Sequence, residues 1–350
     1  MIMDKKKILV TGGTGYIGAH TVVELDAAGY SVVIVDNFSN SSPDVLDGLE
    51  RITGKRHPFM KLDCADRGDM ERLFGEHPDI SAAIHFAAFK AVGESVDKPL
   101  EYYRNNIDSL INLLEAFQSR GIEGGIVFSS SCTVYGQPDN DHLPVSESAP
   151  LQPAASPYGR TKQICEDILA DTVKASKGGL KAIALRYFNP IGAHPSALIG
   201  ELPTGIPQNL LPFVTQTAIG LRKELSIFGD DYNTPDGTCI RDYIYVCDLA
   251  RAHVKAVERI IENSERAGEI EFFNLGTGRG LSVLEVVNRF MEATGVNVPY
   301  KIVGRREGDI EKVWANPLKA NEVLGWKADT PLEDVFRSAW GWEKKIRQNI

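Results

Sequence analysis

The chain has 350 residues, of which 43% are hydrophobic and 24% are charged, a composition typical of a globular protein with room for two lobes. A formal net charge of -9 and a pI near 5.4 argue against a nucleic-acid-binding protein, which usually carries a basic excess. No apolar stretch approaches the length that spans a membrane. Because the chain is acidic, an anionic substrate would have to be met by local arginines.

The five cysteines are scattered, with no C-x-x-C pair and no histidine at metal-ligand spacing. This spacing predicts neither a disulfide framework nor a metal site. The apolar run Ile8–Val10 leads straight into a glycine-rich turn and is shorter than the apolar core of a signal peptide. We therefore expect a protein of the reducing cytoplasm.

The first predicted elements are a strand, a helix and a second strand in a crossover connection. The β-branched runs Ile8–Val10 and Val32–Val35 are the strands, and the amphipathic segment between them is the helix. Further buried strands are expected near residues 60, 85, 128 and 185. Helices are expected between them, over Asp69–Gly75, Pro99–Arg120 and Tyr158–Lys174. Strands that alternate with helices in this way predict an α/β fold with a doubly wound parallel Rossmann sheet, covered on both faces.

After Phe188 the chain becomes rich in proline and glycine, which indicates the start of a second lobe. We expect this C-terminal domain to be the smaller one, of mixed α/β structure, and to bind substrate. From Arg241 one more strand and helix predict a return to the first lobe over about 240–262. The expected division assigns residues 1–188 and this returning segment to the first domain, and residues 189–239 and 263–350 to the second.

The turn "TGGTGYIG" after the first strand sets Gly12, Gly15 and Gly18 at three-residue intervals. Glycine lets the backbone turn tightly and approach a pyrophosphate, while the following helix offers N–H groups and the positive end of its dipole. Many turns are rich in glycine, so the motif predicts a dinucleotide site only because a strand precedes it and a helix follows.

Asp36 closes the second strand, at the spacing where a dinucleotide site places its ribose-binding carboxylate. A carboxylate there accepts from the 2'-hydroxyl of NAD and repels the 2'-phosphate of NADP, and Asn37 and Phe38 supply no arginine for that phosphate. The sequence therefore favours NAD. Asp63 ends the third strand in the same way and is expected either to bind adenine or to cap a helix before Asp66.

"SPYGRTK" places Tyr158 and Lys162 four residues apart, on one face of the predicted helix. A tyrosine has a pKa of about 10, but an adjacent ammonium and the positive charge of a nicotinamide both favour the phenolate. We therefore expect a general base with a lowered pKa. The spacing alone also fits a surface tyrosine with an unrelated lysine.

The segment "FSSSCTVYG" favours the catalytic interpretation. It places Ser129 to Thr133 at the carboxyl edge of the sheet, where open α/β sheets bind their ligands. The hydroxyls there can share a proton with Tyr158 and with a sugar oxygen.

Taken together, segments along the chain are far more specific than any one motif: "TGGTGYIG", "HFAAFKAVGES", "YYRNN", "FSSSCTVYG", "SPYGRTK", "RYFNPIGAHP", "IPQNLLPF", "DGTCIRDYIYVCDLA" and "NLGTG". From Ile8 to about Trp342 the chain resembles the extended short-chain dehydrogenases, and most closely the UDP-glucose 4-epimerase family. The resemblance implies a first domain that binds NAD and a second that binds a UDP-sugar. It also implies an NAD-dependent isomerase of galactose metabolism, which inverts C4 of UDP-glucose and UDP-galactose through a 4-keto sugar and bound NADH.

The resemblance also assigns roles to residues. It makes Tyr158 the base, Ser131 or Thr133 the proton relay, and Lys162 the residue that holds the nicotinamide ribose and tunes the base. The implied cofactor site contains Gly12, Gly15, Tyr16, Ile17, Gly18, Asp36, Asn37, Ser39, Asn40, Ser41, Asp63, Cys64, Phe86, Ala87, Ala88, Lys90, Asn105, Ser129, Tyr158, Lys162 and Phe188. The implied substrate contacts are Lys90, Ser131, Tyr158, Asn189, Asn209, Leu210, Phe228, Arg241, Arg306, Asp309 and Val313.

Two of these substrate positions carry arginine. A guanidinium fork at Arg241 and Arg306 suits a pyrophosphate, which an acidic protein must neutralise locally. A surface salt bridge is the alternative, especially for Arg306 with Asp309 nearby.

Val313, just before Trp314, occupies a position where some members of the family carry a tyrosine that crowds the 2-position of the sugar. Valine is smaller, so we hypothesise that UDP-N-acetylglucosamine and UDP-N-acetylgalactosamine are also accepted.

Other activities of the same fold stay open. A 4,6-dehydratase needs a further acid/base pair, placed by its family right after the strand-end hydroxyl, and here those positions hold Cys132 and Thr133. A UDP-glucuronate 4-epimerase or decarboxylase is not separated by these motifs. A non-catalytic NAD-binding regulator is disfavoured, since a protein that only binds has no use for an intact Ser131, Tyr158 and Lys162 set.

The resemblance further implies a homodimer that pairs through the two helices Pro99–Arg120 and Tyr158–Lys174. An apolar stripe of Leu110, Leu113, Leu114 and Phe117 on the first helix fits such pairing, and fits packing onto the sheet equally well.

Overall fold

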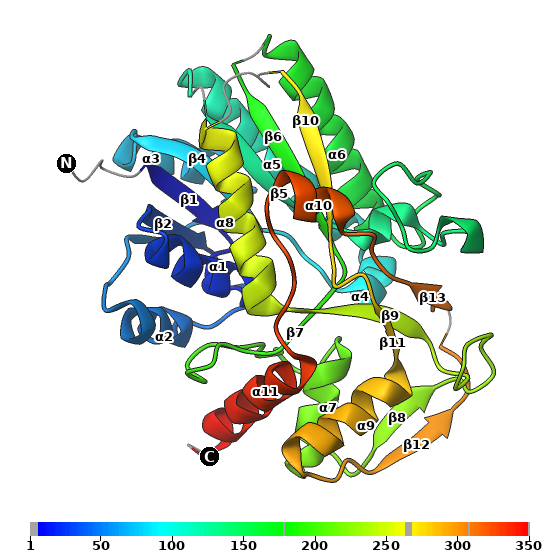
Figure 1. Ribbon diagram of the computed structural model, residues 1–350. Helices are drawn as coiled ribbons and strands as arrows, with labels where there is room; N and C mark the ends of the chain where they lie inside the picture. The colour runs from blue at the N-terminus through cyan, green and yellow to red at the C-terminus, as the bar shows by residue number, and fades with distance from the viewer. Residues whose placement is uncertain (1–5, 123, 178, 263–267, 307–308, 349–350) are drawn as a thin grey trace.

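The structure is a computed structural model that describes residues 6–122, 124–177, 179–262, 268–306 and 309–348. It has a large lobe built on a seven-stranded sheet and a smaller lobe built on short strands and helices (Figure 1).

The large sheet has the strand order β10-β6-β5-β4-β1-β2-β3, and its neighbouring strands all run parallel. Its inner strands are buried on both faces, which explains their continuous apolar runs, while the edge strands β3 and β10 are only partly buried. This sheet confirms the predicted doubly wound fold. The strands are β1 (Lys7–Thr11), β2 (Ser31–Asp36), β3 (Phe59–Lys61), β4 (Ile80–His85), β5 (Gly125–Ser131), β6 (Lys181–Tyr187) and β10 (Ile270–Leu275).

Helices cover both faces of this sheet (Figure 1). On one face lie α1 (Tyr16–Ala27) and α8 (Val246–Glu262), which pack against each other. On the other face lie α3 (Arg67–Glu76), α5 (Pro99–Ser119) and α6 (Pro157–Ala175). The remaining helices of this lobe are α2 (Asp44–Thr53), α4 (Val92–Asp97), α10 (Leu318–Val323) and the short 3-10 helices η1 (Cys132–Tyr135) and η2 (Asn140–His142).

The apolar stripe on α5 faces the sheet. Leu110 and Leu113 are fully buried, and Leu114 and Phe117 are almost fully buried within the single chain. The stripe is therefore part of the core and gives no support to a partner interface.

The smaller lobe is built around β9 (Ile240–Tyr245), which pairs antiparallel with β11 and parallel with β7 and β13. A separate parallel pair is formed by β8 and β12. The other elements of this lobe are β7 (Asn189–Ile191), β8 (Leu225–Phe228), β11 (Gly280–Ser282), β12 (Tyr300–Val303), β13 (Lys312–Val313), α7 (Leu210–Ala218), α9 (Val283–Thr294) and α11 (Leu332–Arg347).

The segment expected to return to the first lobe divides between the lobes. Helix α8 packs on the large sheet as expected, but β9 pairs only with strands of the smaller one. The large sheet is completed by β10, which lies within residues 263–350 that were expected in the second domain. The sequence pattern of a strand predicts its extended conformation but not the strand with which it pairs, so the sheets that contain β9 and β10 were not predicted correctly. The domain boundaries themselves stay a prediction.

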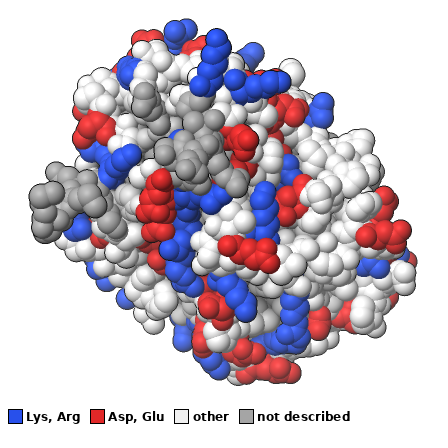
Figure 2. All heavy atoms as spheres, turned by 45° about the horizontal axis from the view of Figure 1, so that its top comes forward, with Lys and Arg blue, Asp and Glu red and all other residues white. Residues whose placement is uncertain are grey.

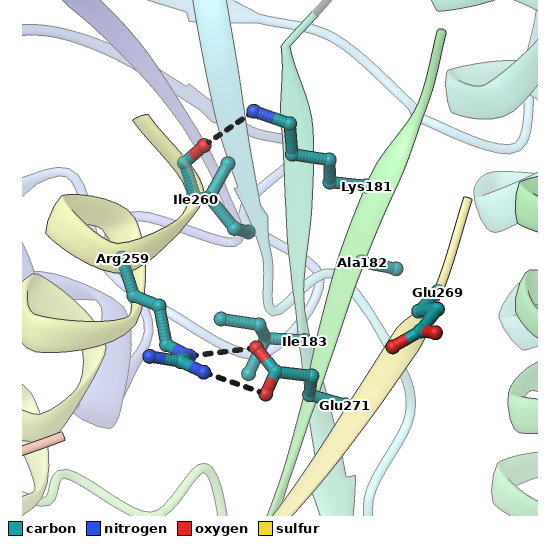
Figure 3. Close-up of a pocket in the computed structure, with 7 residues that line it drawn as sticks. All are labelled: Lys181, Ala182, Ile183, Arg259, Ile260, Glu269 and Glu271. Atoms are coloured by element: carbon teal, nitrogen blue, oxygen red, sulfur yellow. Dashed lines mark hydrogen bonds and ion pairs between the residues drawn. The ribbon is translucent and has the colours of Figure 1, made fainter. Parts of the chain in front are cut away.

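An ion pair ties α8 to β10 near the amino-terminal ends of the strands. Arg259 donates from Nε and Nη2 to the two carboxylate oxygens of Glu271, at 2.7 and 2.9 Å. Close by, Lys181 Nζ donates to the carbonyl oxygen of Ile260 at 3.1 Å (Figure 3). These groups line a shallow pocket at the edge of the sheet opposite to its carboxyl end.

On the face seen in Figure 2, basic and acidic side chains are intermingled. Within the described ranges, none of the helices combines the length and the apolar character that crossing a bilayer needs. All five cysteines are unpaired thiols.

Candidate active site

The glycine turn after β1 packs against the end of β4. Gly12 has a φ of +68°, and a Cβ there would lie 2.9 Å from the Ala87 nitrogen. A Cβ on Gly18 would lie 2.3 Å from the carbonyl oxygen of Gly12, so the first turn of α1 approaches the loop as only glycine allows. Gly15 caps α1 without a side chain, which leaves the first N–H groups of the helix for a ligand.

Asp36 ends β2 beside this turn. Its carboxylate accepts from the backbone N–H groups of Thr14 and Phe38, at 3.1 and 2.9 Å, and from the Ser41 hydroxyl at 3.1 Å. The side chain is thus held in place where a ribose would meet the carboxyl edge of the sheet. Ser39 and Asn40 belong to the same loop, in which Ser39 N–H donates to the Asn37 side chain at 2.9 Å.

Asp63 follows β3 and does not cap α3. Its carboxylate accepts from the Ala65 N–H at 2.9 Å and from the Asn37 amide at 3.4 Å, and the cap of α3 is Asp66. The alternative of a helix cap is therefore wrong for Asp63. Cys64, the next residue, is buried, and burial raises the pKa of its thiol to about 12.

The end of β4 continues the same edge. Phe86 N–H donates to the Thr11 carbonyl oxygen at 3.1 Å, and Ala87 and Ala88 follow it into the loop that carries Lys90. Asn105 lies on α5, where its side chain donates to Asn106 at 2.9 Å. Glycine turn, fixed carboxylate and free helix N-terminus together fit a dinucleotide.

Tyr158 lies in the first turn of α6, which is capped by Ser156 through a 3.2 Å hydrogen bond from the Gly159 N–H. One turn later Lys162 is buried, and its Nζ donates to the carbonyl oxygen of Ser129 at 2.6 Å. The same ammonium lies 5.8 Å from the centre of the Tyr158 ring. Helix α6 thus brings Tyr158 and Lys162 to the carboxyl end of β5.

Without a nicotinamide, the groups of the chain raise the pKa of Tyr158. Burial raises this pKa to about 12, and a hydrogen bond with Ser131 opposes the rise only in part. Burial lowers the pKa of Lys162 to about 8, opposed by the charges of Cys165 and Glu166. In the chain by itself, desolvation of the phenol outweighs an ammonium that is held at the Ser129 carbonyl. The expectation of a lowered pKa included the positive charge of a nicotinamide, so it stays a prediction.

The two candidate proton relays have different surroundings. Ser131 Oγ accepts from the Thr133 N–H at 3.2 Å and is hydrogen-bonded to Tyr158. Thr133 Oγ1 is buried and meets no hydrogen-bond partner in the described part of the chain. Both residues lie at the end of β5 and the start of η1, where Thr133 packs against Gly159, the neighbour of Tyr158.

The predicted substrate arginines share one carboxylate. Arg306 Nη2 donates to Asp309 at 2.6 Å, and Arg241 Nη2 lies 4.0 Å from the same oxygen. The Arg306 guanidinium also lies 5.7 Å from the centre of the half-exposed Phe228 ring. The salt bridge expected as an alternative for Arg306 is present, and it keeps Arg306 close to Arg241.

Glu201 connects residues predicted for different ligands. Its carboxylate accepts from the Asn209 side chain at 2.5 Å and lies 3.6 Å from Lys90 Nζ. Leu210 begins α7 directly after Asn209. The hydroxyl of Tyr16 at the start of α1 donates to the Gly192 carbonyl oxygen at 2.6 Å, while its neighbour Ile17 packs between the cores of both lobes.

Phe188 and Val313 meet in a small apolar cluster beside η1, and Asn189 follows as the first residue of β7. Val313 is 3% exposed and is the register partner of Arg241. The predicted specificity residue therefore lies next to a predicted substrate arginine.

Sequence reasoning missed Glu201 and the buried pair Glu166 and Arg186. Glu166 had a readable signal, since it follows Lys162 by four residues and so shares the helix face of Tyr158. Arg186 and Glu201 gave none, because no local pattern places Arg186 against Glu166, or Glu201 against Asn209 and Lys90.

A doubly wound sheet of this order with a serine, a tyrosine and a lysine at its carboxyl edge defines the class of the extended short-chain dehydrogenases. A family model described as GDP-mannose 4,6 dehydratase matches residues 9–339. UDP-glucose 4-epimerase of Dictyostelium discoideum is 51% identical over 337 residues, which cover 96% of this chain and 95% of that protein. The chain belongs to the UDP-glucose 4-epimerase family.

Two solved structures of the family are closely similar. UDP-glucose 4-epimerase from Stenotrophomonas maltophila, with bound NAD and formylated UDP-arabinopyranose, matches with a TM-score of 0.93 and 48% identity, covering 99% of this chain and 100% of that one. The enzyme from Bifidobacterium longum, in complex with NAD+ and UDP, matches with a TM-score of 0.92 and 46% identity at the same coverage.

Proposed function

We propose that this protein is an NAD-dependent isomerase that interconverts UDP-glucose and UDP-galactose by inverting C4 of the hexose, a step of galactose metabolism. The observation that carries the proposal is the meeting of Tyr158, Lys162 and Ser131 at the carboxyl edge of the large sheet. The glycine turn and Asp36 at the same edge fit the dinucleotide that such chemistry needs. Bound NAD supplies a hydride acceptor and donor, and the residues of this chain supply the proton transfer and the binding.

Tyr158 is the group that takes and returns the proton of the 4-hydroxyl. With a pKa of about 12 it keeps its own proton at neutral pH in the chain alone. A further positive charge beside the ring is needed to make it a base, and Lys162, mostly protonated at pH 7 with a pKa of about 8, is fixed too far away to act alone. This arrangement suits a base that becomes active only when a cationic ring is bound.

Arg241 and Arg306 are proposed to hold the pyrophosphate of UDP. Asp309 keeps the two guanidinium groups together in the smaller lobe, where Arg241 lies on β9. Asn189, Asn209, Leu210 and Phe228 are proposed to contact the remainder of the UDP-sugar. Lys90, whose ammonium is half exposed, is proposed to contact both cofactor and substrate.

Dehydration is a second activity of the fold, and the matching family model carries a dehydratase description. Elimination of water requires an acid/base pair after the strand-end hydroxyl. Cys132 and Thr133 stand there, and burial raises the pKa of the Cys132 thiol to about 12. This thiol is not ready to exchange a proton at neutral pH, which favours epimerisation.

A cytoplasmic location and a homodimer are proposed as well. Support for the location comes from the unpaired cysteines, which suit a reducing compartment. The dimer is proposed through the outer faces of α5 and α6, by resemblance alone, and light scattering on the purified protein tests it.

The test of function is direct. Purified protein with no added cofactor is incubated with UDP-galactose, and formation of UDP-glucose is followed by chromatography. Tyr158→Phe serves as the control and should lower the rate by about 10²- to 10⁴-fold, the usual contribution of a general base. If wild type converts no UDP-galactose even with NAD added, the proposal is wrong and uronates become the next substrates to try.

Acceptance of N-acetylated sugars is tested at Val313. We expect wild type to convert UDP-N-acetylglucosamine, and Val313→Tyr to lose that activity because the ring would claim the acetamido volume. Turnover of UDP-galactose by the same variant is the control. Wild type that epimerises UDP-glucose and leaves UDP-N-acetylglucosamine untouched would sink the hypothesis.

A further inference from the structure

A buried polar layer crosses three strands, one residue inside the carboxyl edge of the large sheet. Ser130 on β5, Arg186 on β6 and Asn274 on β10 are register partners in adjacent strands. Ser130 and Asn274 are fully buried and Arg186 is 3% exposed. A row of polar side chains at this depth must be hydrogen-bonded to be tolerated.

Glu166 on α6 accepts the hydrogen bonds of this layer. Its Oε1 accepts from Ser130 Oγ at 2.6 Å and from Arg186 Nε at 2.9 Å, and its Oε2 accepts from Arg186 Nη2 at 2.6 Å. Glu166 follows Lys162 by four residues and Tyr158 by eight, so the three side chains share one face of the helix. The carboxylate therefore joins the helix of the predicted base to β5 and β6.

The layer also fixes η1, which carries Thr133. Arg186 Nη1 donates to the Tyr135 hydroxyl at 3.0 Å, and this hydroxyl donates to Asn274 Oδ1 at 2.7 Å. The guanidinium lies 5.1 Å from the centre of the Tyr135 ring and 4.4 Å from that of Phe272. Helix α6, the end of β5 and η1 carry all the predicted proton-transfer groups, and each is bonded to this one ion pair.

Stability alone is a weak reason for such a pair. Desolvation of two charges offsets most of their attraction, and apolar residues of similar volume often stabilise a core as well. What apolar residues cannot supply is direction, because a guanidinium fork on a carboxylate fixes both the distance and the angle between two elements.

We propose that Glu166 and Arg186 are positioning residues, whose ion pair sets α6 against β5 so that Tyr158 meets Ser131 and Lys162 meets the Ser129 carbonyl. The inference rests on the proposed epimerase function, which it deepens. It requires that loss of the pair should harm turnover and cofactor contact more than it harms folding.

The charges around Lys162 allow the proposed role of Glu166 to be tested by the pH dependence of kcat. The titratable groups that face it are Tyr158, Cys165 and Glu166 on α6 and His85 on β4. Burial lowers the pKa of Lys162, and the negative charge of Glu166 opposes this by raising it. Loss of that charge, with Arg186 left unpaired, lowers the pKa of Lys162, so the ammonium is lost at a lower pH.

The experiment compares Glu166→Gln with Glu271→Gln. Glu271 forms a bidentate pair with Arg259 that ties a helix to the same sheet, at its opposite end (Figure 3). We expect Glu166→Gln to lower kcat about tenfold or more with KM for UDP-galactose within about twofold. In the pH profile of this variant, the alkaline limb, where kcat falls as the pH rises, should move to lower pH by about half a unit or more.

Glu271→Gln should keep kcat and the alkaline limb, whatever it does to the melting temperature. The inference is overturned when Glu166→Gln keeps the wild-type kcat per folded molecule and the wild-type limb, or when Glu271→Gln shifts both as much. If Glu166→Gln does not fold, Ser130→Ala replaces it, because this variant keeps the ion pair and removes only the bond from β5 to Glu166. It should shift kcat and the limb in the same direction by a smaller amount, and an unchanged profile overturns the inference.

A second readout separates this inference from the proposed function. NADH affinity is measured by fluorescence titration, since Lys162 is proposed to hold the nicotinamide ribose. Glu166→Gln should bind NADH about tenfold more weakly than wild type, and Glu271→Gln equally well. Wild type that converts no UDP-galactose defeats the proposed function, and NADH affinity then decides the positioning role by itself.

Discussion

At the scale of single residues, the hydroxyls of Ser131 and Thr133 differ in what they contact. Ser131 already has two hydrogen bonds, to the Thr133 N–H and to Tyr158. Thr133 Oγ1 is buried, and within the described ranges it has no partner, while the residue itself packs against Gly159, which follows Tyr158. A buried hydroxyl left in this state costs about 1–3 kcal/mol, so it is a group that a bound sugar oxygen can satisfy.

The Thr133→Val variant tests this reading. The valine has nearly the same shape and loses no hydrogen bond, so the free energy of unfolding should stay the same or rise by about 1 kcal/mol. Turnover of UDP-galactose should fall by about 10- to 100-fold, because a hydrogen bond to a group that gains charge in the reaction is lost. Ser131→Ala is the companion variant, and unchanged turnover in Thr133→Val would assign the relay to Ser131 alone.

At the scale of elements, the start of α6 controls where Tyr158 lies. The cap residue Ser156 is buried and accepts at 3.2 Å from the N–H of Gly159, so this bond spans Tyr158 in the sequence. Helix α9 also begins at a serine cap, in which Ser282 accepts from the Glu285 N–H at 3.0 Å and donates to Asp236. Because Ser282 lies in the smaller lobe and its helix carries no predicted proton-transfer group, the two caps help to separate stability from catalysis.

We expect Ser156→Ala to lower the free energy of unfolding by about 1 kcal/mol and Ser282→Ala by at least as much, because the latter also loses its bond to Asp236, measured by urea denaturation. Only Ser156→Ala should lower kcat, by about tenfold, because a frayed first turn misplaces Tyr158. Equal kcat in the two variants would mean that the packing of α6 holds the tyrosine without its cap.

The same element shows how far sequence patterns reach. The strands of the crossover and the helices of the first lobe were predicted from periodicity, since a local pattern decides a local conformation. The strands that pair with β9 could not be predicted in this way, because its contacts come from distant parts of the chain. The buried carboxylate of Asp242, for example, accepts from the N–H groups of Thr277 and Ala315. For the site, motif and spacing placed Tyr158 near β5, but no sequence pattern indicated that burial raises the pKa of its phenol in the chain by itself.

At the scale of the whole molecule, histidines link folding to pH. His20, His85 and His253 are buried in the large lobe, and burial lowers their pKa values to about 3, 3 and 4. Burial also lowers the pKa of the less buried His57 and His194. All five therefore favour the neutral ring in the folded state.

An unfolded histidine takes up a proton near pH 6.5, and the folded ones do so only near pH 3 to 4. Below pH 6.5 the unfolded chain therefore binds more protons, so the stability that these groups contribute above pH 6.5 is lost as the pH falls. Between pH 7 and 5.5, above the range of ordinary carboxyl groups, each buried histidine should remove about 1.3 kcal/mol, or roughly 4 kcal/mol for the three. Urea denaturation at both pH values measures the difference.

The His253→Gln variant is the control for this prediction. Its glutamine does not titrate, so the loss of unfolding free energy between pH 7 and 5.5 should shrink by about one third, whatever the variant costs at pH 7. The slope with pH is the quantity to compare, because a cavity or a lost bond to the Leu249 carbonyl shifts stability equally at both pH values. A wild-type protein equally stable at pH 7 and 5.5 would contradict the prediction, since it would mean that these rings gain protons in the folded state as readily as in the unfolded one.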